Sequence, residues 1–180
     1  MNQTQTRKLI YTAICISLGL LLPMVGKIPG ANLGAILLPM HIPVLLAGFL
    51  CGAPYATFCG MILPILNYVL TGRPPIFPTG ISMMLELGSY GCITAVLYRV
   101  TKGRVYISLI GAMLGGRIVM GIANTILWGM QGDTYGFSVF LTSAFVKALP
   151  GIAIQLIIIP IILYALKKAK LTDLNEWYDL

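Results

Sequence analysis

The segment from Ile28 to Gly72 contains no Lys, Arg, Asp or Glu. It is about twice as long as the roughly 20 residues that one helix needs to cross the hydrocarbon core of a bilayer. Two spans therefore fit into it, and we expect the break between them at CGAPY, Cys51 to Tyr55. Across the whole chain 58% of residues are hydrophobic and 9% are charged, too few polar residues to cover a water-exposed surface. The sequence predicts an all-α integral membrane protein.

The same length criterion predicts six transmembrane helices in one membrane domain, residues 1–180. The expected spans are about residues 9–24, 33–51, 55–70, 80–98, 105–130 and 137–166. The last two exceed one straight crossing, so we expect them to tilt, kink or extend beyond the bilayer. The stretch RKLIYTAICISLGLLL resembles a signal peptide, but no Ala-x-Ala type cleavage site follows it. We interpret it as a retained first helix.

Basic residues predict the orientation. Two lie at the start of the chain, three between the fourth and fifth spans and three after the sixth: Arg7, Lys8, Arg99, Lys102, Arg104, Lys167, Lys168 and Lys170. The other face has only Lys27 and Arg73. By the positive-inside rule, both termini are cytoplasmic. This topology also explains the net charge of +7, so no nucleic-acid partner is predicted.

Several functions are disfavoured by what the chain lacks. Its four cysteines fall inside apolar spans without Cys-x-x-Cys spacing, and there is one histidine, so neither a metal site nor a disulfide framework is predicted. The chain has no Gly-x-x-x-x-Gly-Lys motif, so ATP hydrolysis would require another subunit. Acid and base groups are few at membrane depth, which argues against an enzyme, and we predict no catalytic residues and no cofactor bound by this chain.

Polar residues at membrane depth are the candidates for function, because they are costly there unless paired or used. They are Glu86, Arg117, Asn124, Lys147 and Gln155. Glu86 can neutralise only one of the two cations, Arg117 and Lys147. The remaining cation is satisfied either by helix carbonyls and water or by an anionic or strongly polar group of a ligand.

Small residues four apart form a second pattern. The pairs are Ala13 and Ser17, Gly48 and Gly52, Gly111 and Gly115, and Ala144 and Ala148. Each pair lies on one helical face and allows close approach of another helix. The pattern fits packing within the bundle and equally the docking of a partner subunit.

The order of these features resembles a known family. The run LPMHIPVLLAGFLCGAPYATFCGMILPIL and the following TGRPPIFPTG are similar to the substrate-binding S component of energy-coupling-factor (ECF) vitamin transporters. The resemblance implies a six-helix bundle in the bacterial cytoplasmic membrane that binds a vitamin from outside. It also implies two kinds of partner, a membrane T component and two cytosolic ATPases that use ATP. In such families helix one carries an Ala-x-x-x-Ala docking motif, whose counterpart here is Ala13 and Ser17.

We place the ligand site in the outward half, beneath the loops of residues 27–34 and 71–79. Helical spacing lets Glu86, Asn124 and Lys147 converge on one cavity, with Arg117 nearly beneath Asn124. We expect Asn124 and one cation to bind the polar end of the ligand, while Glu86 balances the other cation.

Other candidates surround this cavity. Tyr90, one turn deeper than Glu86, is expected to form an aromatic wall. Trp128 either covers the site or belongs to the aromatic belt at the interface. His41, between Pro39 and Pro43 at a predicted bend, makes either a structural hydrogen bond or a ligand contact. Arg73 lies in a proline-rich loop whose restricted backbone suits a lid.

Two alternative functions remain at this point: a self-contained secondary transporter or channel for a small polar metabolite, and an intramembrane enzyme. The sequence does not identify the vitamin. A surplus cation favours a carboxylate or phosphate bearer such as pantothenate, and a neutral cobalamin precursor with hydrogen-bonding groups fits as well.

Overall fold

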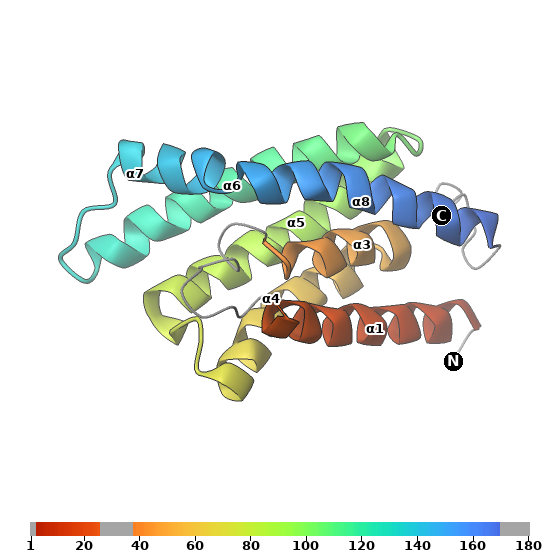
Figure 1. The fold of residues 1–180 in the computed structure, drawn as a ribbon, viewed down its shortest axis with the longest axis horizontal. Helices are drawn as coiled ribbons and strands as arrows, with labels where there is room; N and C mark the ends of the chain where they lie inside the picture. Colours follow the sequence, from red (N-terminus) through yellow and green to blue (C-terminus); the bar gives the residue numbers. More distant parts are fainter. Residues whose placement is uncertain (1–2, 26–37, 170–180) are drawn as a thin grey trace.

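The computed structural model describes residues 3–25 and 38–169, and every regular element among them is helical (Figure 1). The helices are α1 (Gln3–Val25), α3 (His41–Cys51), α4 (Ala53–Thr71), α5 (Ile81–Val100), α6 (Val105–Gly129), α7 (Phe137–Leu141) and α8 (Leu149–Lys168). A kinked turn, η1 (Ile76–Gly80), precedes α5, and a π-helical turn, η2 (Thr142–Val146), precedes α8. The all-α prediction is confirmed.

Five helical segments of the described part are long and apolar enough to cross a membrane. α3 has only 11 residues, about 17 Å at 1.5 Å per residue. The predicted second span, residues 33–51, begins among residues that lie outside the described part. Within that part, a turn at Pro39 and Met40 leads into α3 at His41. The sixth predicted span is divided into α7, η2 and α8.

α3 occupies the middle of the bundle and packs against α1, α4, α5 and α8. Ten of its 11 residues are buried, Ile42 being the exception. A helix that is apolar on every side is stable only when neighbours cover it all round. Gly52, with φ of 85°, ends α3 and reverses the chain into α4 within the predicted CGAPY break.

Glycines bring α5 close to its neighbours. A Cβ on Gly60 of α4 would lie 2.4 Å from the backbone of Leu87, and one on Gly48 of α3 would lie 2.7 Å from Thr94. Gly111 of α6 approaches the side chain of Leu97 in the same way. α5 is therefore held against α3, α4 and α6, and its position fixes that of the polar side chains it carries.

The two ends of the bundle differ in charge. The start of α1, the end of α8 and the α5–α6 turn lie at one end, which we call the termini end (Figure 1). The α4–α5 and α6–α7 connections lie at the opposite, far end (Figure 1). Basic residues of the described part gather at the termini end, in α1, the α5–α6 turn and the last turn of α8, whereas Arg73 lies at the far end. Lys27 and Lys170 lie outside the described residues.

We predict that the termini end faces the cytoplasm. In intact cells, a membrane-impermeant thiol reagent is expected to label Gln131→Cys in the α6–α7 connection and to leave Lys102→Cys in the α5–α6 turn unlabelled. Lys102→Cys should react once the membrane is opened, and the unmodified protein gives the background from the four native cysteines. Labelling of Lys102→Cys but not Gln131→Cys from outside would reverse the topology.

Candidate functional site

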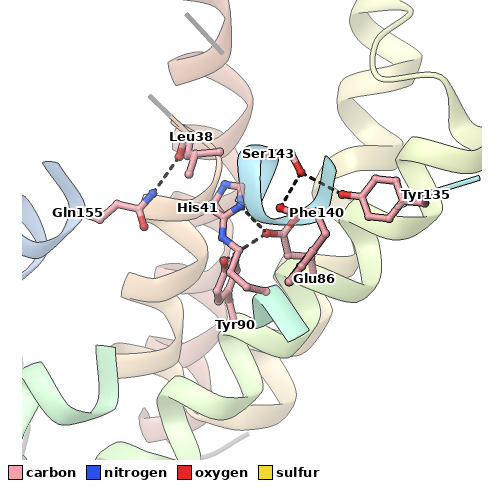
Figure 2. Close-up of polar contacts among 9 residues, drawn as sticks. Leu38, His41, Glu86, Tyr90, Tyr135, Phe140, Ser143 and Gln155 are labelled. Carbon is pink, nitrogen blue, oxygen red and sulfur yellow. Dashed lines mark hydrogen bonds and ion pairs between the residues drawn. The ribbon is translucent and has the colours of Figure 1, made fainter. Parts of the chain in front are cut away.

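A buried polar cluster lies where α3, α5 and α6 meet. Its four residues, His41, Glu86, Tyr90 and Arg117, are named here the Glu86 cluster, and none is more than 5% exposed. The Tyr90 hydroxyl donates a hydrogen bond of 3.2 Å to Glu86 Oε1. The same oxygen lies 3.5 Å from His41 Nε2 and 3.5 Å from Arg117 Nη1. Figure 2 shows His41, Tyr90 and Glu86 pointing toward one another.

Local sequence explains this convergence. Glu86 and Tyr90 are four residues apart on α5 and therefore share one face. A Cβ on Gly116 of α6 would lie 2.6 Å from the Tyr90 ring, so glycine at this position allows α6 to approach the ring. Arg117, the next residue, then reaches Glu86. His41 is the first residue of α3, and its ring packs on Tyr90 with centroids 5.2 Å apart.

The charges of Glu86 and Arg117 cancel. Removing one ion from water without its partner would cost several kcal/mol, so the pairing stabilises both. The distance of 3.5 Å between Arg117 Nη1 and Glu86 Oε1 is nevertheless long. A charge-assisted N–H···O bond usually measures about 2.7–2.9 Å. Within the described residues, Arg117 Nε and both His41 ring nitrogens make no hydrogen bond. The 3.5 Å contact of His41 is thus electrostatic and adds charge attraction only when the ring is protonated.

The turn before α3 is held by side chains from two other helices. Gln155 of α8 donates to the Leu38 carbonyl at 3.4 Å (Figure 2). Asn67 of α4 approaches Met40 Sδ at 3.4 Å. Leu38 has a φ of 49°. This turn therefore sets the start of α3 and the position of His41. The structural hydrogen bond weighed for this histidine is not observed among the described residues, because neither ring nitrogen has a hydrogen-bond partner there.

Two buried polar residues near the cluster were not among the candidates from the sequence. Asn67 is 6% exposed and Ser82 is 2% exposed. Asn67 Oδ1 and Ser82 Oγ have no hydrogen-bond partner in the part of the chain that the structure describes. The sequence carried two signals for these residues: Asn67 is one of two asparagines in the charge-free segment, and Ser82 lies one turn before Glu86.

Four candidates lie apart from the cluster. Asn124 and Trp128 are half-buried on the far part of α6, and Arg73 is exposed in the α4–η1 connection. No hydrogen bond or ion pair among the described residues joins Asn124, Trp128, Arg73 or Lys147 to Glu86.

The expected convergence of Lys147 with Glu86 is not observed, since Lys147 is exposed. Its N–H bonds to the carbonyl of Thr142, five residues back, so the π-helical turn shifts the helical phase there. Ala144 and Ala148 occupy the buried positions, at 0% and 1% exposure. Arg117, rather than Lys147, is the cation that neutralises Glu86.

The small-residue pairs differ in whether they pack inside the bundle. Gly111 and Gly115 pack on α5 side chains, and Ala144 and Ala148 are buried. Ala13 and Ser17, in contrast, are exposed on α1, beside exposed Ile10 and Ile14. This pair faces away from the bundle, so close packing inside the described part does not account for it.

A groove of about 510 Å³ lies between α6 and α7, away from the Glu86 cluster. Its lining is largely apolar and includes Ile118, Ile122 and Phe140. A surface of this composition within membrane-spanning helices is expected to contact lipid.

Comparison with known proteins identifies the family of this chain. A protein-family model described as "ECF transporter, substrate-specific component" matches residues 7–163. No curated protein and no solved structure shows a significant match to the chain. The matched region contains the Glu86 cluster and the Ala13 and Ser17 pair.

We predict that Glu86→Gln destabilises the protein by about 3–5 kcal/mol, because it leaves the Arg117 charge buried without a partner. The double variant Glu86→Gln, Arg117→Met removes both charges and should be more stable than the single variant. Lys147→Met, at an exposed position, is the control and should unfold like the unmodified protein. Thermal unfolding of the purified protein in one detergent measures all three. A double variant less stable than Glu86→Gln would contradict the pairing.

Proposed function

The chain belongs to the substrate-specific components of ECF transporters, and we propose that it captures a vitamin or vitamin precursor from outside for ATP-driven uptake. The observation that supports this proposal most directly is the Glu86 cluster. A carboxylate, a guanidinium and an imidazole are nearly fully buried among apolar helices. Ionisable groups at such depth are rare, and they commonly belong to substrate or ion sites.

The depth of the cluster suits capture from the far end. Glu86 lies five residues into α5 from that end, and Arg117 lies 12 residues from the end of α6. At 1.5 Å per residue these positions are roughly 8 and 18 Å below the far ends of their helices. With the termini in the cytoplasm, the far end faces outward, and a ligand reaches the cluster from outside.

Two ligand classes fit the proposal. Pantothenate offers a carboxylate for Arg117, and a cobalamin precursor offers uncharged hydrogen-bonding groups. Asn124 and Trp128, half-buried on the far part of α6, are proposed to contact the outer portion of the ligand. Arg73 is proposed to lie over the site as part of a lid.

Energy for uptake is proposed to come from partners, a membrane T component and two cytosolic ATPases. The exposed Ala13 and Ser17 face on α1 is proposed as the docking surface for the T component. Small side chains allow the backbone of a second helix to approach and gain dispersion contacts. The Ser17 hydroxyl donates to the Ala13 carbonyl at 2.9 Å, so its polarity is satisfied within α1.

We predict that Ala13→Trp abolishes uptake in cells that supply the T component and ATPases, while the isolated variant still binds its ligand. The bulky ring would hold the partner helix away from α1. Ile110→Trp, at an exposed position on α6, adds the same bulk to another face and should leave uptake intact. Co-purification of the T component with each variant measures docking. Normal assembly and uptake with Ala13→Trp would remove α1 from the interface.

We also predict that the protein, purified gently from membranes, retains a small molecule that mass spectrometry identifies as a vitamin or vitamin precursor. The tagged protein should carry the T component and ATPases with it. In liposomes, the chain alone should not concentrate that compound. Sustained uptake by the chain alone would instead establish a self-contained transporter or channel.

A further inference from the structure

Several buried polar atoms around the Glu86 cluster have no hydrogen-bond partner among the residues that the structure describes. They are Asn67 Oδ1, Ser82 Oγ, Arg117 Nε and both ring nitrogens of His41. Each side chain is more than nine-tenths buried. An unsatisfied polar group in such a setting costs about 1–3 kcal/mol, so several of them together indicate groups arranged for something other than stability.

The side chains that carry these atoms come from four helices, and each is linked to Glu86 through the chain or through a contact. Ser82 is one turn before Glu86 on α5, toward the far end, and shares its face. Asn67 contacts Met40, which adjoins His41. Arg117 contacts Glu86 directly. Each of these side chains is therefore linked to Glu86 by one helical turn or by one or two contacts. Ser82 lies on the far-end side of Glu86, from which the proposed ligand would arrive.

The chemistry of this group is mixed rather than cationic. Arg117 Nε is a donor, Asn67 Oδ1 is an acceptor, and the Ser82 hydroxyl is both. A neutral imidazole adds one donor and one acceptor. The carboxylate of Glu86 already balances Arg117, and Lys147 is exposed elsewhere.

A ligand carboxylate or phosphate at this site would add a second buried negative charge against one guanidinium, which is costly in a low-dielectric interior. An uncharged group with its own donor and acceptor would instead satisfy the unpartnered atoms without changing the charge balance.

We propose that the ligand group bound beside Glu86 is uncharged and presents a hydrogen-bond acceptor and donor together, as a carboxamide, lactam or ring amide does. Its carbonyl accepts from Arg117 Nε, and its N–H donates to Asn67 Oδ1 or Ser82 Oγ. This inference rests on the proposed function, and it selects the amide-bearing class over an anionic group as the part that reaches the cluster.

The test compares two buried hydroxyls, only one of which belongs to this group. Thr94 Oγ1 is also buried and unpartnered, but it lies two turns beyond Glu86 toward the termini end, against Gly48. The probe is the compound released from the unmodified protein, added back to each ligand-free variant and followed by calorimetry. Ser82→Ala is expected to weaken its binding about three- to tenfold. The control Thr94→Val is expected to leave the affinity unchanged.

Thermal unfolding of the ligand-free variants shows whether a loss of binding comes from misfolding. Both substitutions remove an unsatisfied hydroxyl, so both should keep or raise the melting temperature. Asn67→Ala provides a second binding variant, with an expected loss of about three- to tenfold. Unchanged affinity in Ser82→Ala and Asn67→Ala, with folded proteins, would overturn the inference.

The released compound gives an independent outcome. A compound that carries an amide-type group supports the inference, whether or not another part of it is ionised. A compound without such a group overturns it while leaving the proposed function intact. Retention of no small molecule, together with failure to bind a T component, overturns the proposed function and this inference with it.

Discussion

The centre of this structure depends on one constraint: the negative charge of the buried Glu86 carboxylate must be balanced. The carboxylate is 3% exposed among apolar helices, where an isolated charge is prohibitive. Arg117 on α6 balances its charge, Tyr90 on its own helix donates a hydrogen bond to it, and His41 on α3 lies 3.5 Å from the same oxygen. Those contacts require three helices to hold one relative position. The glycines that let α3, α4 and α6 approach α5 make that position possible.

We propose that the two ends of the buried region serve different purposes. Toward the termini end, α3 is almost wholly apolar and tightly packed, as Phe49 at 1% exposure illustrates. Toward the far end, the same helix begins at His41, and buried polar atoms without partners accumulate around it. Packing stabilises the fold at one end, while at the other a bound ligand would contribute the missing hydrogen bonds. Such a division couples ligand affinity to apo-state stability, because groups kept for binding are unfavourable without it.

The proposed ligand site and the proposed docking face lie on different elements. The residues of the Glu86 cluster lie on α3, α5 and α6, whereas Ala13 and Ser17 lie on the face of α1 that points away from the bundle. α1 packs on α3 and α4, and α3 carries His41, so α3 connects the two regions physically. The Leu38 carbonyl and Met40 Sδ, which Gln155 and Asn67 approach, tie the start of α3 to α8 and α4 as well. A ligand that contacts His41 would therefore act on the helix against which α1 rests.

The sequence by itself determined that the chain lies in a membrane, that it is helical and which residues needed explanation. Hydropathy, span length and the free-energy cost of burying the charges of Glu86 and Arg117 are local properties of the sequence. It also identified Ala13 and Ser17 as one of four equivalent pairs. Only the tertiary structure decided that Arg117 neutralises Glu86, that His41 joins them and that Lys147 is exposed. Those outcomes depend on how far apart the helices pack and on the shift in helical phase at η2. Residue spacing along one helix predicts neither of them. The tertiary structure also decided that Ala13 and Ser17 point away from the bundle, because the opposite face of α1 packs against α3 and α4.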